Sequence, residues 1–112
     1  MSNNIILLSS FIKNYKRFIK KFPSLKNELE ILEEKLMENP QMGESLGHNL
    51  YKIRLASKDK NAGKSGGFRI ISYLIVKTDT ITTIYLVKMY DKSEEQTIKT
   101  SVLLQLVKSI FG

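Results

Sequence analysis

Two long stretches rich in β-branched and aromatic residues constrain the fold of this chain more than any other feature. They occupy residues 67–76 and 81–90, and only the polar segment Lys77-Thr78-Asp79-Thr80 separates them. Such side chains favour extended backbone, so two stretches joined by so short a segment predict an antiparallel hairpin. Their richness in isoleucine indicates that this hairpin lies at the centre of a sheet.

Three further segments show the apolar spacing of amphipathic helices. The first follows Ser9-Ser10 and ends at Pro23, and the second is capped by Ser24 and closed by Asn39-Pro40. Because only a short break at the proline separates them, they predict an antiparallel helical hairpin. The third helix is expected to begin at the capping-box sequence Ser93-Glu94-Glu95-Gln96. Its apolar stripe comprises Ile98, Val102, Leu106 and Ile110, widened by Leu103 and Val107.

Two shorter strands, over residues 5–8 and 50–55, complete the expected elements, with residues 41–49 as a loop. The order β, α, α, β, β, β, α predicts a single α+β domain over residues 1–112. We expect a small twisted sheet of about four mainly antiparallel strands, with the helices packed on one face. Lys52 and Arg54 alternate with Ile53 and Leu55, so the two cations should point to the face that the helices leave open.

Positive charge is concentrated around that strand. The chain has a net charge of +7, and residues 50–77 contain seven basic residues against one acidic residue. This concentration favours a polyanionic partner. The chain has no cysteine, which excludes disulfides and thiolate chemistry. Its N-terminal apolar run is too short for a signal peptide or a membrane span, so we expect a cytoplasmic protein without a membrane partner.

Residue types and spacing exclude several kinds of catalytic site. Gly63-Lys64-Ser65 resembles the end of a nucleotide-binding loop, but Lys58 stands where that loop needs glycine, and a strand follows instead of a helix. His48 is the only histidine, and no acidic pair on the strands has metal-ligand spacing, so no cofactor is expected. Lysine, arginine and tyrosine remain as the residue types that could form a catalytic site. They are sufficient to cleave RNA, which supplies its own 2′-hydroxyl nucleophile.

Several linked motifs over about residues 39–96 resemble the RelE/ParE superfamily of bacterial toxins, especially its HigB-like branch. They are an Asn-Pro-x-x-Gly helix end, the strand "KIRLAS", the loop and strand "GKSGGFRIISY", and the strand end "IYLVKMYDKSE". The resemblance implies a RelE-like fold and a toxin of a type II toxin-antitoxin module. It also implies a ribosome-dependent messenger RNA endonuclease that needs no metal and inhibits translation. The partners that it implies are messenger RNA, the ribosome and a cognate antitoxin of the helix-turn-helix, HigA-like kind; we expect a monomer when free.

The resemblance also assigns roles to residues. The implied catalytic residues are Lys52, Arg54, Arg69, Tyr90 and Lys92, and the implied RNA-binding residues are Lys58, Lys60, Lys64 and Tyr73. Asp91 and Ser93 depart from the pattern of relatives, which often have a small residue and asparagine there. The general base stays open between Lys52 and a tyrosine.

Two other functions and several structural roles fit the same residues. The chain could be a ParE-like toxin that inhibits DNA gyrase, although the concentrated cations argue against it, or a catalytically inactive RNA-binding module. Arg69 could pair with Asp91 or Glu94 within the fold. Tyr73 and Tyr90 could be aromatic residues at the edge of the core instead of groups that stack on bases.

Overall fold

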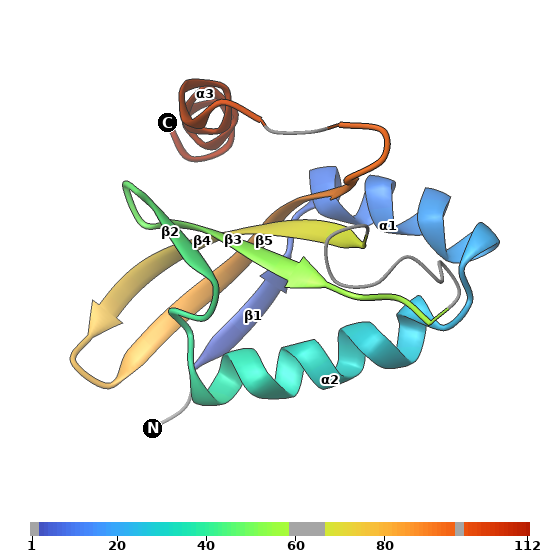
Figure 1. Ribbon diagram of the computed structural model, residues 1–112. Helices are drawn as coiled ribbons and strands as arrows, with labels where there is room; N and C mark the ends of the chain where they lie inside the picture. Colours follow the sequence, from blue (N-terminus) through green and yellow to red (C-terminus); the bar gives the residue numbers. More distant parts are fainter. Residues whose placement is uncertain (1–2, 59–66, 96–97) are drawn as a thin grey trace.

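The computed structural model describes residues 3–58, 67–95 and 98–112 of the chain. In these ranges the chain forms β1 (Asn4–Leu7), α1 (Ser9–Lys21), α2 (Leu25–Glu38), β2 (Glu44–Gly47), β3 (Leu50–Leu55), β4 (Phe68–Thr78), β5 (Ile81–Asp91) and α3 (Thr100–Phe111). The expected α+β class is confirmed (Figure 1). None of the helices in these ranges is long and apolar enough to cross a membrane.

The five strands form one mixed sheet in the order β1-β5-β4-β3-β2. The predicted hairpin is confirmed, since β4 and β5 pair in antiparallel register and have β3 and β1 as outer neighbours. β1 runs parallel to β5, and the other pairs are antiparallel. The β4–β5 register shifts between Ile71, which pairs with Lys88, and Ser72, which pairs with Leu86, so Val87 is an additional residue of β5 at this point. This shift is a β-bulge with one extra residue in β5.

The prediction of a plain loop over residues 41–49 is wrong, because this segment contains β2. The strand is short and largely exposed, with the sequence ESLG, so no apolar alternation marks it. His48 and Asn49 form the turn from β2 to β3, with φ angles of 54° and 64°. Two left-handed residues in a two-residue hairpin loop match the twist of the flanking strands. The only histidine therefore has a conformational role in a tight turn.

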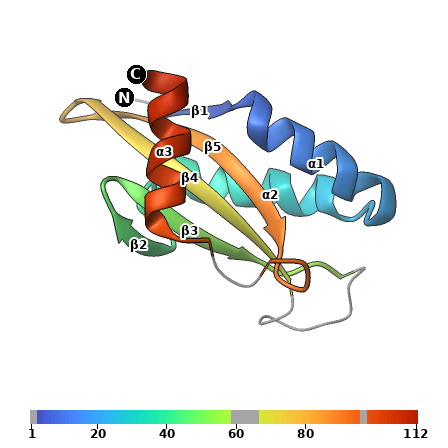
Figure 2. The ribbon, with the colours of Figure 1, turned by 90° about the horizontal axis from the view of Figure 1, so that it is seen from above.

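The N-terminal helices cover one face of the sheet, as expected. Four leucines of α2 and two phenylalanines of α1 are buried together with apolar residues of β3, β4 and β5. Figure 2 shows α2 returning along the sheet after α1 has led away from β1. Phe68 of β4 is fully buried in this core, with its ring centroid 4.9 Å from that of Phe18 and 5.4 Å from that of Phe22.

The expectation that all helices pack on one face is wrong. α3 lies against the opposite face, where Leu103 and Val107 are buried with Leu50, Ile71 and Val87. Figure 1 shows α3 on the far side of the sheet from α2. Its apolar stripe is also rotated from the expected one, because Val102 and Ile110 are 52% and 40% exposed. α3 thus leaves open only part of the face to which Lys52 and Arg54 were assigned.

The predicted start of the last helix at Ser93 is wrong as well. α3 begins at Thr100, and Gln96 of the supposed capping box lies outside the described residues. The Asp91 carboxylate accepts hydrogen bonds from the Ser93 backbone N–H (2.9 Å) and hydroxyl (2.8 Å). Aspartate and serine compete for backbone groups in this way, and the result here is a turn. Arg17 of α1 holds the turn through two hydrogen bonds to the Glu94 carboxylate, at 3.2 and 2.9 Å.

Candidate functional site

The register of the sheet aligns three of the residues that the sequence singled out. Arg54 of β3 lies opposite Arg69 of β4, and Arg69 lies opposite Tyr90 of β5. Residues directly opposite each other on neighbouring strands point to the same face of a sheet. Arg54, Arg69 and Tyr90 therefore form one row across three adjacent strands, which we call the first row.

A second row lies two residues away, about 6.7 Å along the strands. It comprises Lys52 of β3, Ile71 of β4 and Lys88 of β5. Its two lysines stand on either side of the buried Ile71. Sequence analysis missed Lys88, which is outside the basic segment of residues 50–77. Its position two residues before Tyr90 was the available signal, because alternate residues of a strand share a face.

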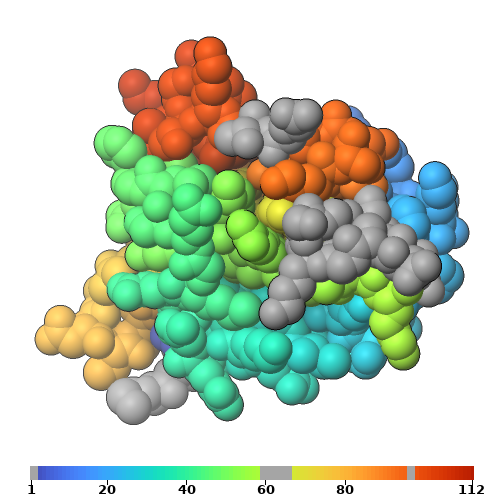
Figure 3. Space-filling view, in the orientation of Figure 1, coloured from blue at the N-terminus to red at the C-terminus, as the bar shows by residue number. Residues whose placement is uncertain are grey.

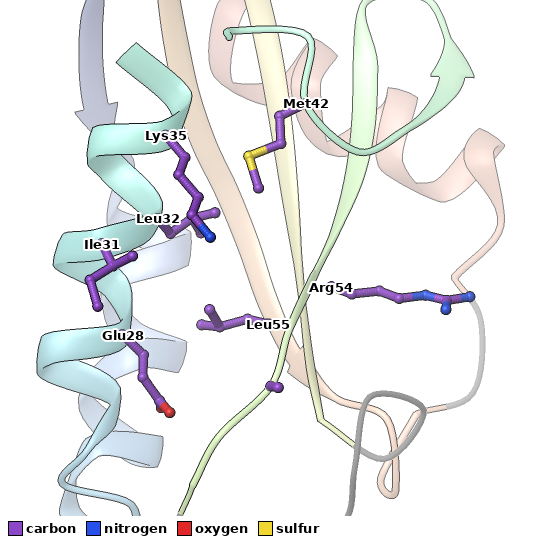
Figure 4. A pocket seen from close by; sticks show the side chains of 8 residues that line it. Glu28, Ile31, Leu32, Lys35, Met42, Arg54 and Leu55 are labelled. Atoms are coloured by element: carbon purple, nitrogen blue, oxygen red, sulfur yellow. The ribbon is translucent and has the colours of Figure 1, made fainter. Parts of the chain in front are cut away.

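Arg54 is the exposed member of the first row. Figure 4 shows its side chain extending from β3 away from α2, whereas the side chain of Leu55 extends toward α2. A pocket of about 260 Å³ lies between α2 and β3, and its lining includes Arg54 together with Glu28, Ile31, Leu32, Lys35, Met42, Leu55 and Ala56. The guanidinium of Arg54 is thus directed to the face that carries the two rows.

Arg69 and Tyr90 are far more buried, with 2% and 1% of their surface exposed. The Arg69 guanidinium donates a hydrogen bond through Nη1 to the backbone oxygen of Phe68, at 3.2 Å. In the space-filling view only a small area of the first part of β4 appears between β3 and the segment after β5 (Figure 3). A guanidinium also binds a phosphate in bidentate geometry, which gives Arg69 a chemistry suited to an RNA backbone.

Burial raises the pKa of the Tyr90 hydroxyl above its ordinary value, and nearby Glu95 and Glu44 act in the same direction. The positive charge of Arg69 acts against this shift by lowering the pKa. Because burial is the largest cause, the hydroxyl keeps its proton at neutral pH. Tyr90 can donate a proton or a hydrogen bond there, and it is poorly suited to the role of general base.

The raised pKa of Tyr90 gives a direct spectroscopic prediction. We expect its hydroxyl to titrate above pH 10 in the folded protein, and Arg69→Met to raise the titration further because a lowering charge is lost. Tyrosinate absorbance against pH, taken as the difference between each protein and its Tyr90→Phe derivative, measures both values. A folded pKa above the unfolded one also means that stability declines as pH rises through the folded pKa. A Tyr90 titration at or below pH 10 would contradict the assignment.

Each lysine of the second row lies near a carboxylate. The Lys52 ammonium is 3.5 Å from the Glu44 carboxylate of β2, and the Lys88 ammonium is 3.9 Å from the Glu95 carboxylate after β5. The two glutamates are 64% and 45% exposed, so these are surface ion pairs. Such pairs contribute little to stability, and a phosphate can replace the carboxylate.

Of the other predicted site residues, Lys58 and Lys92 lie in the segments that follow β3 and β5. Lys58 is exposed after β3, and its backbone N–H donates to the Glu28 carboxylate at 3.0 Å. The half-buried Lys92 follows β5, and its backbone N–H donates to the Gly67 oxygen at 3.2 Å. Lys60 and Lys64 lie outside the described residues.

Tyr73 and Asp91 are not part of the first row. Tyr73 lies four residues beyond Arg69 on β4, and its ring centroid is 5.2 Å from that of Phe111 in α3. Its ring therefore packs against the C-terminal helix, which matches the structural role considered for it. Asp91 is opposite Phe68 in the register, and Phe68 belongs to the core beneath the N-terminal helices. The departure at Asp91 therefore affects the turn after β5 more directly than the first row.

Comparisons with known proteins concern the whole fold. No protein-family model matches the chain. Among solved structures it is similar to a double arginine-to-alanine mutant of the E. coli toxin RelE in the free state, with a TM-score of 0.60 and 18% sequence identity. The match covers 99% of this chain and 100% of that one. The α+β sheet and its three helices therefore have a RelE-like fold.

Proposed function

We propose that this chain is the toxin of a bacterial type II toxin-antitoxin module and cleaves messenger RNA on the ribosome without a metal ion. The observation that carries the proposal is the first row, in which Arg54, Arg69 and Tyr90 lie side by side across three strands. The concentrated positive charge and the RelE-like fold support it. A phosphate above Arg69 would have a second guanidinium on one side and a protonated phenol on the other.

These groups suit cleavage by the 2′-hydroxyl of the RNA itself. The 2′-oxygen bonds to phosphorus while the bond to the 5′-oxygen of the next nucleotide breaks, leaving a 2′,3′-cyclic phosphate and a 5′-hydroxyl. Arg54 and Arg69 stabilise the negative charge that builds up on the phosphate oxygens. Tyr90 donates the proton that the departing 5′-oxygen needs. Lys52, next to Arg54 on β3, accepts the 2′-hydroxyl proton when its amine is neutral.

The proposal includes partners. Messenger RNA positioned in the ribosome is the substrate, and a cognate antitoxin of the helix-turn-helix kind holds the toxin inactive. An acidic surface on either partner would complement the cations of the two rows.

The experiment that tests the proposal is induced expression followed by primer extension along one message in two forms, with and without its start codon. We expect growth arrest and cuts at codon positions only in the translated form. Arg54→Ala is the inactive control: this exposed side chain can be removed without opening the core, and we expect the cuts to be lost. Arrest without cuts would favour inhibition of gyrase, and soluble protein that neither arrests growth nor cuts RNA would favour an inactive RNA-binding module.

A further inference from the structure

Lys88 is the one lysine of the two rows to which neither sequence motif nor proposed chemistry gives a role. It lies two residues before Tyr90 on β5 and opposite Ile71, so it shares the face of the first row. Its side chain is 28% exposed, with the ammonium 3.9 Å from the Glu95 carboxylate. A surface ion pair of this length contributes little to stability, so it does not explain why a lysine stands on an inner strand of the sheet.

The proposed chemistry gives the bound RNA a direction across the sheet, and the inference rests on that proposed function. Lys52, on β3, stands on the side of the attacking 2′-oxygen, whereas Tyr90, on β5, stands on the side of the departing 5′-oxygen. The attacking and departing oxygens lie on opposite sides of the phosphorus in an in-line displacement. The upstream nucleotide then lies toward β3, and the downstream nucleotide lies toward β5.

We propose that Lys88 binds the phosphate immediately 3′ of the scissile one. The rows are about 6.7 Å apart along the strands, a separation similar to that of successive phosphates in an extended single strand of RNA. With a scissile phosphate at the first row and a downstream strand that leaves toward β5, the next phosphate comes within reach of a cation on β5 one row away. Lys88 is the cation at that place, and the phosphate replaces Glu95 as its partner.

This role makes Lys88 a positioning residue that holds the downstream strand while the 5′-oxygen departs. It touches no bond that forms or breaks. Removing the contact should slow cleavage through substrate alignment, and the loss should depend on the charge of one defined phosphate.

The test uses single-turnover cleavage on ribosomes programmed with a synthetic message that is cut by the wild-type protein. Three forms of the message are compared: unmodified, with a neutral methylphosphonate at the linkage 3′ of the cut, and with one at the linkage 5′ of the cut. The proteins are wild type, Lys88→Met and Lys77→Met, which removes a lysine from the exposed far end of β4. Arg69→Ala serves as the control for the proposed nuclease site.

We expect the 3′ methylphosphonate to slow the wild type and Lys77→Met about tenfold. On the unmodified message, Lys88→Met should cleave about as slowly as the wild type does on the 3′-modified message. The 3′ methylphosphonate should then lower the rate of Lys88→Met little further. Equal sensitivity of Lys88→Met and wild type to the 3′ modification would overturn the inference while the nuclease stands. If Lys88→Met instead lost its sensitivity to the methylphosphonate at the 5′ linkage, the proposed direction of the RNA across the sheet would be wrong. Absence of cleavage by the wild type on every message tried would refute the proposed function itself, whereas full activity of Arg69→Ala would contradict the role of the first row.

Discussion

Replacing Arg69 by alanine is expected to lower the single-turnover cleavage rate by about 10²- to 10³-fold, the loss typical of removing one preorganised donor to a charged transition state. Arg69 is the middle residue of the first row, between Arg54 and Tyr90, and is 2% exposed. In such a poorly hydrated position its charge acts on the phosphate with little screening by water. Arg69→Lys keeps the charge but loses the planar pair of donors, so we expect an intermediate rate.

The loss of activity must be separated from a loss of folding, because a buried side chain is being removed. Val87→Ala is a suitable control, since Val87 is fully buried on the same sheet face but belongs to the apolar cluster under α3. It should be destabilised yet cleave at nearly the wild-type rate. Circular dichroism and thermal unfolding of both variants establish that each is folded at the assay temperature. A folded Arg69→Ala protein with the wild-type rate would contradict the role of the first row.

Replacing Phe68 by alanine is expected to have the largest effect on stability, a loss of about 3–5 kcal/mol in the free energy of unfolding. The side chain is fully buried, and its ring packs against those of Phe18 and Phe22, so the cavity would open between β4 and α1. The total free energy of unfolding of a small domain is about 5–15 kcal/mol, so this loss would be a large part of it. Urea unfolding with linear extrapolation measures the change.

Phe111→Ala is the matched control for that measurement. Phe111 is 37% exposed at the end of α3, although its ring lies 5.2 Å from that of Tyr73 and 4.8 Å from that of Tyr85. The same chemical change there should cost less than half as much, because water already reaches the site and little cavity forms. Equal losses at the two positions would mean that the core beneath the N-terminal helices does not dominate the stability.

The sequence was most informative where one physical pattern was strong and uninterrupted. The stretches at residues 67–76 and 81–90 gave the central hairpin nearly to its ends because branched side chains favour extended backbone throughout them. β2 has no such pattern, and the turn at Asp91 takes the serine that a capping box would have used. Local competition of this kind is not visible in residue spacing.

The candidate site could be predicted only in part, because it depends on register. The motifs pointed to Arg54, Arg69 and Tyr90 separately, but only the pairing of β3, β4 and β5 places them in one row. The β-bulge in β5 was not predictable either, because residue spacing within one strand does not show where its partner strand lacks a residue. Tyr73 illustrates the same dependence on tertiary structure: it shares the face of the row, and its ring packs against Phe111 of α3.

The bulge at Val87 divides β5 into two halves with different surroundings. Before it, Tyr85 and Val87 pack beneath α3; after it, the strand presents the half-buried Lys88, while Tyr90 stays buried in the same cluster as Leu103 and Val107 of α3. A bulge absorbs one residue without reversing the side chains that follow. Because of the extra residue, Val87 and Lys88 both belong to the α3 side of the sheet, so one strand supplies a packing residue and a cation side by side.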